Sequence, residues 1–384
     1  MSQISSEYRI CARCVMDTSD PEITFCRQGV CNHCDSYLRE IKGLFYQGER
    51  SDRELERLIE QVRLDGKHRE HDCVIGVSGG TDSSYLAYQT KQWGLRPLAV
   101  HVDNGWNSLE AVRNLRTVCE ELKIDYVSYV LNWEDFRDVQ LAFLRSSIVE
   151  IEIPTDVALM TALHEVAAKH GVRYVLSGGN LANEGILPFS WFYYPKDSLL
   201  LKSIHQKFGI RKPVRYYTFD FWQEIYYKFF RRIRLLYPLN YVPYSKADAK
   251  KTLEELFRWE DYGRQHQESH FTKFVQGYVQ PTKFGIDYRR CIYSTQICLG
   301  RMTRAEALEL LKTPPYDAAK LTEELAYIAK KLAISIEELE EILRKPPCTH
   351  RDYPNQEKLL SLIYRLYRLI FATRRSNSGT GQQR

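Results

Sequence analysis

Four cysteines near the start of the chain have the spacing of a metal site. They form two CxxC pairs: Cys11, Cys14, Cys31 and Cys34. Each CxxC turn brings two sulfurs together, and the connection between the pairs is long enough to let them face each other across one ion. This pattern predicts a structural Zn²⁺ ion bound by four thiolates. His33 or Cys26 could replace a ligand, and free thiols in a disordered leader are the alternative interpretation.

The segment VIGVSGGTDSSYLAY, residues 74–88, joins an apolar strand to an amphipathic stretch through a glycine turn. Gly79 and Gly80 permit close approach of the backbone, so that successive N–H groups can converge on an anion at a helix N-terminus. The segment has no lysine and matches neither GxxxxGK[ST] nor GxGxxG, which excludes a Walker loop. It predicts a phosphate cradle of amides and hydroxyls, or else a ligand-free turn, formed by Ser78, Gly79, Gly80, Thr81, Asp82 and Ser83.

Two further strand ends carry polar groups. The stretch LAVHVDNGWN places His101, Asp103 and Asn104 at the end of an apolar run, and the stretch YVLSGGN ends in Gly179 and Asn180. A polar strand end alone is often only a turn. Beside a phosphate loop, however, such residues are candidates to bind a nucleotide.

These candidates lie on apolar runs that alternate with amphipathic helices from residue 73 to about residue 179. Strands that alternate with helices predict an α/β fold with a doubly wound parallel sheet. In such sheets the ligand binds at the carboxyl ends of the strands, which is where the polar residues fall.

A second polar segment follows much later, at residues 259–308, where charged and aromatic residues are interleaved. Such a mixture is typical of sites that bind a sugar or a base, although a charged surface helix would look similar. The candidates for catalysis or proton transfer are His266, Glu268 and His270, and the candidates for substrate binding are Lys273, Lys283, Arg289, Arg290 and Arg301.

Length and composition indicate a globular protein with more than one domain. We predict a zinc-binding module at 1–45, a nucleotide-binding α/β domain at 46–190, a mainly helical region at 191–373 and a disordered tail at 374–384. The net charge of +5 is too small to indicate a nucleic-acid partner. No apolar run is long enough for a membrane helix and no secretory signal is evident, so a cytoplasmic location is expected.

Residues 216–237 are rich in aromatic and basic side chains. Phe221, Ile225, Phe229 and Ile233 recur at every fourth position, which favours a helix that faces the core. The basic residues leave a second interpretation, a helix that lies in a membrane interface.

The loop SGGTDS resembles the SGGxDS signature of the PP-loop ATP pyrophosphatases. In that superfamily the loop holds the pyrophosphate of ATP while the α-phosphate is attacked, which yields an adenylated substrate. The resemblance implies that ATP and Mg²⁺ are the cofactors and that Asp82 is the magnesium-associated acid.

A closer resemblance covers about residues 8–345. The CxxC pairs, SGGTDS, VDNGW, SGGN, YGRQHQESHFTKF and KFGIDYRR are similar to those of the N-acetyl sugar amidotransferases of bacterial surface-polysaccharide and flagellin-glycan biosynthesis. Two departures concern substrate contacts: Gln265 stands where a basic residue is usual, and RCIYSTQI replaces a string closer to RAHLS.

This resemblance implies that the acetamido group of a nucleotide-linked sugar becomes an acetamidino group. It also implies a separate glutaminase subunit, of the type that serves imidazole glycerol phosphate synthase, because the sequence shows no glutaminase motif. The rival enzyme class is tRNA thiolation, which generally needs a reactive cysteine near ATP, and neither Cys73 nor Cys119 is obviously placed for that. A non-enzymatic scaffold fits poorly with an intact SGGTDS.

Overall fold

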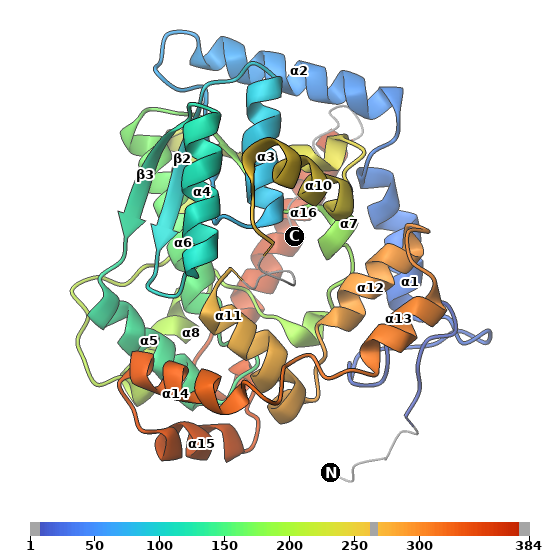
Figure 1. Cartoon of the computed structure of the whole chain (residues 1–384), viewed down its shortest axis with the longest axis vertical. Coiled ribbons are helices and arrows are strands. Elements are labelled where there is room, and N and C mark those ends of the chain that lie inside the picture. The colour runs from blue at the N-terminus through green and yellow to red at the C-terminus, as the bar shows by residue number, and fades with distance from the viewer. Residues whose placement is uncertain (1–7, 262–267, 376–384) are drawn as a thin grey trace.

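The computed structural model describes residues 8–261 and 268–375, with side chains to residue 366. Its centre is one parallel sheet of five strands in the order β3-β2-β1-β4-β5 (Figure 1). The strands are β1 Cys73–Gly76, β2 Pro97–Asp103, β3 Asp125–Val130, β4 Tyr174–Leu176 and β5 Arg234–Leu236. The first four coincide with the predicted apolar runs, and the predicted α/β fold is confirmed.

Helices surround this sheet. In the first half of the chain they are α1 Asn32–Ser36, α2 Glu49–Gly66, α3 Thr81–Gln92, α4 Leu109–Glu121, α5 Trp133–Ser146, α6 Ile153–Lys169 and α7 Leu181–Glu184. In the second half they are α8 Ser198–Phe208, α9 Phe221–Ile225, α10 Lys246–Phe257, α11 His270–Phe274, α12 Arg289–Cys298, α13 Arg304–Leu311, α14 Leu321–Leu332, α15 Ile336–Arg344 and α16 Glu357–Arg375.

The sheet is covered on both faces because successive strand residues point in opposite directions. On β1, Ile75 packs with residues of α2, α3, α4 and α10, whereas Val74 packs with Leu163 and Val166 of α6. The fold is therefore doubly wound, and the SGGTDS loop lies between β1 and α3.

A separate core lies at the end of the sheet toward which the strands point (Figure 1). It joins residues of α5, α11, α14 and α15, including Phe136, Phe271, Ile328 and Leu339. This placement brings the second polar segment of the sequence to the carboxyl ends of the strands.

The predicted core-facing helix over residues 216–237 is wrong. Here α9 continues as one π-helical stretch, Tyr226–Phe230, and neither part contains a buried residue. The chain then enters β5, so Ile233 is buried against the sheet while Phe229 is half exposed. The sheet thus takes its fifth strand from beyond residue 190, within the region expected to be mainly helical.

The N-terminal cysteine module shares a core with α12 and residues 186–191. Tyr37 is fully buried there, and Val15 donates its main-chain N–H to Ser294 Oγ at 3.2 Å. At the other end of the chain, α16 includes Arg374 and Arg375, which were predicted to begin a disordered tail; residues 376–384 lie outside the described part.

Candidate active site

The loop between β1 and α3 has the backbone geometry of an anion cradle. Gly79 adopts φ +84°, and a Cβ atom there would lie 1.9 Å from the carbonyl oxygen of Ala111, so only glycine fits. No side chain caps the N-terminus of α3, which leaves the first helical N–H groups facing the loop. Ser83 Oγ accepts from the Ser78 N–H at 3.2 Å and closes the turn.

The end of β4 holds Asp82 from the opposite side of the loop. Asn180 and Asn183 each donate from Nδ2 to Asp82 Oδ1 at 3.1 Å, and the Tyr244 hydroxyl donates to the same oxygen. Oδ2 of Asp82 has no hydrogen-bond partner among the described residues. The carboxylate is therefore fixed in direction and keeps one oxygen for a ligand. The turn of Gly179 is closed by a hydrogen bond from its N–H to Ser177 Oγ, and a Cβ atom at the preceding Gly178 would lie 2.9 Å from the Asp82 main chain.

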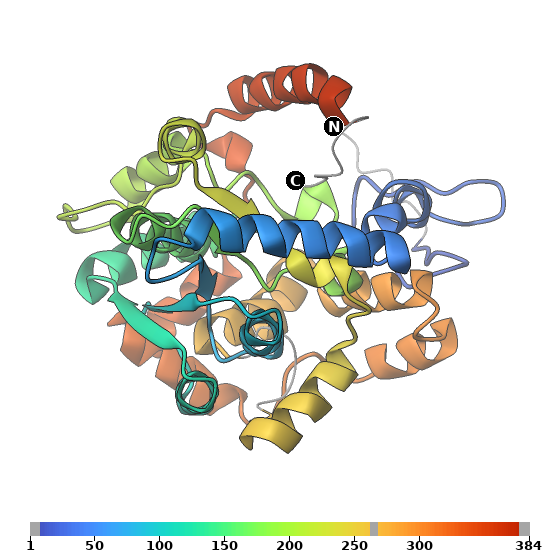
Figure 2. The ribbon, with the colours of Figure 1, turned by 90° about the horizontal axis from the view of Figure 1, so that it is seen from above.

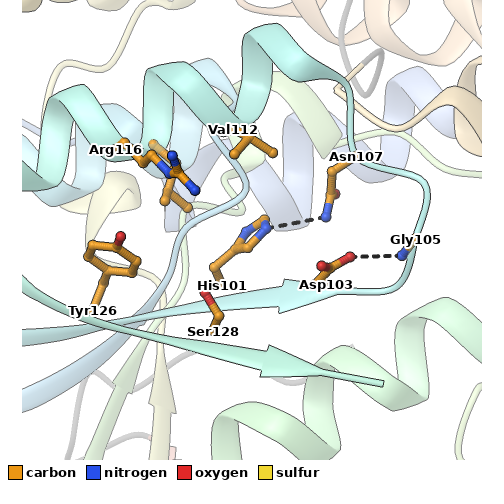
Figure 3. Close-up of a pocket in the computed structure, with 9 residues that line it drawn as sticks. His101, Asp103, Gly105, Asn107, Val112, Arg116, Tyr126 and Ser128 are labelled. Atoms are coloured by element: carbon orange, nitrogen blue, oxygen red, sulfur yellow. Dashed lines mark hydrogen bonds between the residues drawn. The ribbon is translucent and has the colours of Figure 1, made fainter. Parts of the chain in front are cut away.

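The end of β2 forms a cavity of about 240 Å³ beside the loop (Figure 3). Its walls are His101, Asp103, Gly105, Asn107, Val112, Leu115, Arg116, Tyr126 and Ser128. His101 donates from Nδ1 to the Val77 carbonyl at 3.3 Å and accepts from Asn107 at Nε2, and burial lowers the pKa of its imidazole. A neutral histidine, a carboxylate, the Arg116 guanidinium and the apolar side chains of Val112 and Leu115 line one concave site, which suits a base or a ribose.

Asn104 has a structural contact in this turn. Its side-chain oxygen accepts from the Trp106 N–H at 3.1 Å, and the side chain is buried. This hydrogen bond fixes the turn at the place where the distant segment around Glu268 contacts it.

Glu268 reaches the loop through a short antiparallel bridge between Asn107 and Ser269. The Ser108 N–H donates to the Glu268 carbonyl at 2.8 Å, and the Ser78 hydroxyl lies 3.3 Å from Glu268 Oε1. The second carboxylate oxygen, Oε2, is buried without a hydrogen-bond partner among the described residues. An orphaned carboxylate oxygen of this kind is costly unless a cation or a proton donor meets it.

Of the other two catalytic candidates, His270 and His266, only His270 lies within the described residues. His270 begins α11 beside this bridge, where its ring lies 4.9 Å from that of Tyr327 and burial lowers its pKa. His266 lies outside the described residues.

Lys246, at the start of α10, is a site residue that the sequence analysis missed. Burial lowers the pKa of its ammonium group, while the nearby Asp82 and Glu268 carboxylates oppose that shift. It follows Tyr244, whose hydroxyl pKa is raised well above its usual value by burial and by Asp82. A cation thus lies at the loop although the loop itself lacks one, and a single lysine in a helical stretch gives no signal of this role.

Glu152, at the start of α6, is a second missed residue. Desolvation raises the pKa of its carboxyl group to about 8, and the charges of Asp156 and Glu268 act in the same direction. Thr272 donates to Glu152 Oε1 at 2.7 Å. Glu152 is therefore a candidate to carry a proton near neutral pH.

The predicted substrate-binding cations have other partners in the structure. Arg289 is buried and pairs with Asp287 at 2.6 Å, and Arg290 pairs with Asp17 of the cysteine module at 3.0 Å. Lys283 donates to the Ile342 carbonyl at 2.7 Å, and burial lowers its pKa to about 8.

The remaining two cations also make structural contacts. Lys273 pairs with Glu324, and the Arg301 guanidinium lies over the Phe45 ring at 5.4 Å. The structure does not bring these five cations together at the loop, and their contact with substrate remains a prediction.

The four N-terminal cysteines do converge. Their sulfurs lie within 4.8 Å of one another, and the Cys11–Cys34 and Cys14–Cys31 Sγ distances are 3.9 and 3.7 Å. Four sulfurs bound to one Zn²⁺ at 2.3 Å would lie about 3.8 Å apart, so the donor set fits the metal. The Cys31 N–H also donates to Cys11 Sγ at 3.2 Å, as expected for a thiolate ligand.

The alternative ligands of this module lie elsewhere in it. His33 Nε2 meets Asp20 at 2.6 Å, and Cys26 is exposed. Cys298 of α12 lies beside the group, with its sulfur 3.8 Å from that of Cys34. The cysteine module is therefore in contact with a helix of the second polar segment, α12.

Residues 268–368 match a family described as the C-terminal domain of WbpG-like LPS biosynthesis proteins. The matching segment begins at Glu268, the residue that reaches the loop. The fold is a doubly wound parallel α/β sheet with a glycine-containing loop between β1 and α3.

Among curated proteins, tRNA(Ile)-lysidine synthase of Chlamydia pneumoniae is 34% identical over 94 residues. That match covers 24% of this chain and 28% of the relative, so the chain spans little more than a quarter of that relative's length. The shared segment is thus short.

Two solved structures are similar in part. NMN synthetase from Francisella tularensis has 17% identity, covers 69% of this chain and 91% of that one, and gives a TM-score of 0.38. The U34-tRNA thiolase NcsA from Methanococcus maripaludis with its [4Fe-4S] cluster has 15% identity, covers 70% and 82%, and gives a TM-score of 0.33. No helix in the described part of the chain is long and apolar enough to cross a bilayer.

Proposed function

We propose that this protein is an ATP-dependent amidotransferase that converts the acetamido group of a nucleotide-linked N-acetyl sugar into an acetamidino group. The observation that carries the proposal is the contact of Glu268 with Ser78. It joins a segment that matches an LPS biosynthesis family to a loop of the ATP pyrophosphatase type. Surface polysaccharide, or a glycan of flagellin, is the expected destination of the product.

The nucleotide would lie across the carboxyl ends of β1, β2 and β4. The pyrophosphate would meet the N-terminus of α3 and the hydroxyls of Ser78 and Ser83, and the base or ribose would enter the cavity beside His101 and Asp103. Lys246 would neutralise charge on the phosphates from outside the loop.

Asp82 Oδ2 and the orphaned Glu268 Oε2 are hard oxygen donors of the kind that Mg²⁺ binds. Magnesium held there would supply positive charge that stabilises the leaving pyrophosphate. The chain's own contribution is to fix Asp82 through Asn180, Asn183 and Tyr244, so that its carboxylate does not have to reorient during the reaction.

The reaction must activate an amide, whose carbonyl carbon is a poor electrophile. The amide oxygen attacks the α-phosphorus of ATP, the bond to the pyrophosphate breaks, and an O-adenylyl imidate forms. Ammonia then adds to the imidate carbon, and AMP leaves with the former amide oxygen. A proton leaves the added nitrogen, for which His266, Glu268, His270 and the elevated-pKa carboxyl of Glu152 are the candidate acceptors.

We also propose that a separate glutaminase subunit supplies the ammonia. Most free ammonia is protonated at neutral pH, and ammonium is not a nucleophile. Purified protein alone should use ammonium salts but not glutamine. Equal rates with the two nitrogen donors would contradict the partner proposal without touching the amidotransferase itself.

The proposed function is tested by incubating the protein with ATP, Mg²⁺, ammonium and UDP-linked N-acetyl sugars. Mass spectrometry should find a sugar in which NH has replaced one oxygen, together with AMP and pyrophosphate. Glu268→Gln should lower this yield by about 100-fold, whereas the exposed Glu255→Gln of α10 should not.

The outcome that would overturn the proposal is ATP cleavage that needs tRNA and a sulfur donor instead. Such thiolation requires a thiolate near the loop. Cys73 of β1 and Cys119 of α4 are buried, and burial raises the pKa of both thiols.

A further inference from the structure

The segment that was expected to face the core instead exposes its aromatic rings. Trp222 and Phe230 are 74% and 76% exposed, and Tyr226 and Phe229 are about half exposed. An Asp220–Gln223 capping box fixes the start of this helix, so the rings are presented by an ordered element. Four exposed aromatic side chains within nine residues form an apolar patch that is unusual on a protein surface that faces only water.

Helix α16 lies next to this segment and is also apolar on its outer side. Leu359, Leu362 and Leu366 are each about half exposed and follow one stripe of the helix, whereas Leu360 is buried. The Tyr364 hydroxyl donates to Glu224 of α9 at 3.4 Å, which places the two elements side by side. Figure 2 shows α16 along the outer edge of the molecule.

The aromatic segment is bordered by basic residues. Arg231, Arg232 and Arg234 are exposed, and Lys358 and Arg365 lie on the exposed side of α16. A second cavity, of about 360 Å³, opens among Lys228, Phe229, Arg232, Arg234, Arg173, Tyr174 and Asp65. Its single acid, Asp65, is already engaged by the Tyr174 hydroxyl at 2.6 Å and by Arg173 at 3.6 Å. The cavity therefore carries an excess of positive charge.

We propose that α9, residues 226–234 and α16 form a docking face for a membrane surface that contains anionic lipids. The face is defined by the outward side chains Trp222, Tyr226, Phe229, Phe230, Leu359, Leu362 and Leu366. Its rings and leucines enter the boundary between headgroups and acyl chains, and the cavity of four cations receives lipid phosphate. Docking is peripheral, along the plane of the membrane, because no described helix can cross it.

Two features favour a lipid surface over a protein partner. Exposed leucines, tryptophan and basic residues on neighbouring helices are the composition of elements that lie in the interface plane. The cavity also combines four cations with one engaged acid, which suits a headgroup phosphate better than the mixed charges of a protein rim.

The proposal is tested by sedimenting the full-length protein with vesicles. We expect binding to vesicles of equal parts phosphatidylcholine and phosphatidylglycerol at low salt, weaker binding at high salt, and little binding to phosphatidylcholine alone. Protein that stays in the supernatant with phosphatidylglycerol vesicles, or that binds both vesicles equally, would overturn it.

Matched variants locate the face. Phe230→Glu/Leu362→Glu and Arg231→Glu/Arg232→Glu should each weaken binding by about tenfold or more. Leu310→Glu and Arg53→Glu, which change exposed residues of α13 and α2, should bind as the unmodified protein does. Thermal melts by circular dichroism establish that each variant is folded, and equal binding by all four would contradict the assignment.

Tryptophan fluorescence tests the proposal without a measurement of how tightly the protein binds the vesicles. Brominated lipids should quench part of the tryptophan emission, and Trp222→Phe should remove the quenched part. Quenching that survives this substitution would place another surface against the lipid. If the protein instead dimerises without lipid and Phe230→Glu restores the monomer, the face is a contact between copies and the membrane proposal fails.

Discussion

The loop at residues 78–83 and the polar segment at 259–308 were both predicted to bind ligands, and they differ in how they use their residues. The loop uses backbone geometry, which the sequence encodes locally: Gly79 at φ +84° fits against Ala111 and no other residue would. The later segment uses long charged side chains, and Arg289, Arg290 and Lys283 find structural partners far along the chain or in adjacent turns. A charged residue in a sequence therefore indicates a polar partner without saying whether that partner is a ligand.

The comparison shows that the later segment reaches the loop through Glu268 and through Trp259, whose indole N–H donates to the Gly79 carbonyl at 3.1 Å, rather than through its cations. The main chain of Glu268 is fixed by the bridge to residues 107 and 108, so the carboxylate arrives at Ser78 as an extension of the β2 turn.

The largest effect is expected at the loop. Asp82→Ala should lower the rate of AMP and pyrophosphate formation by about 1000-fold, because the fixed carboxylate that would hold magnesium is lost. Chromatographic assay of AMP measures it, and Glu49→Ala, an exposed acid of α2, is the control. A variant that keeps a tenth of the normal rate would remove Asp82 from the reaction.

The cysteine module should show the next largest effect. Cys31→Ser removes one of four thiolates, so the metal content should fall well below one Zn²⁺ per chain and the melting temperature should drop. Cys26→Ser changes an exposed cysteine outside the group and should alter neither. Atomic absorption and thermal melts decide the matter, and a Cys31→Ser protein with full metal content would rule out the four-sulfur site.

Arg290 distinguishes a structural cation from a substrate-binding one. Arg290→Ala should reduce the free energy of unfolding by about 3 kcal/mol, because it leaves the buried Asp17 carboxylate without its ion pair. The KM for the sugar should stay the same. Denaturant unfolding and steady-state kinetics measure the two quantities, with Arg301→Ala as the matched variant. A large rise in KM at unchanged stability would restore the original interpretation of Arg290.

The smallest effect concerns Glu152 and the pH. Its folded-state pKa of about 8 exceeds the usual value of 4.5, so between these values the unfolded chain releases a proton that the folded chain keeps. Its contribution to stability is therefore complete below about pH 4.5 and declines as the pH rises toward 8. Glu152→Gln should gain melting temperature relative to the unmodified protein between pH 5 and pH 8. A constant difference across that range would mean that Glu152 is ionised in the fold.

Much of the fold could be predicted because it depends on patterns of residues that lie close together in the sequence. Apolar runs gave four of the five strands, glycines gave the loop, and CxxC spacing gave the sulfur cluster. The fifth strand was missed because Leu235 and Leu236 follow a stretch of aromatic residues whose fourfold recurrence also fits an exposed helix. The spacing of apolar residues shows that a helix has an apolar side, but it does not show whether the protein core covers that side.

The rest of the site depends on tertiary contacts that the sequence does not reveal. Lys246 comes near Asp82 and Glu268 because α10 packs against α3, and Glu152 at the start of α6 meets Thr272 of α11, which is distant in the sequence. Burial and neighbouring charge, which set the pKa of both groups, are properties of the assembled fold.

The central claim is that the amide oxygen of the sugar is adenylated at this loop, and oxygen-18 in the acetamido carbonyl tests it most directly. After one turnover with ATP and ammonium, mass spectrometry of the nucleotide should find the label in AMP and none in pyrophosphate. Label that stays in the sugar, or that appears in pyrophosphate, would contradict the account.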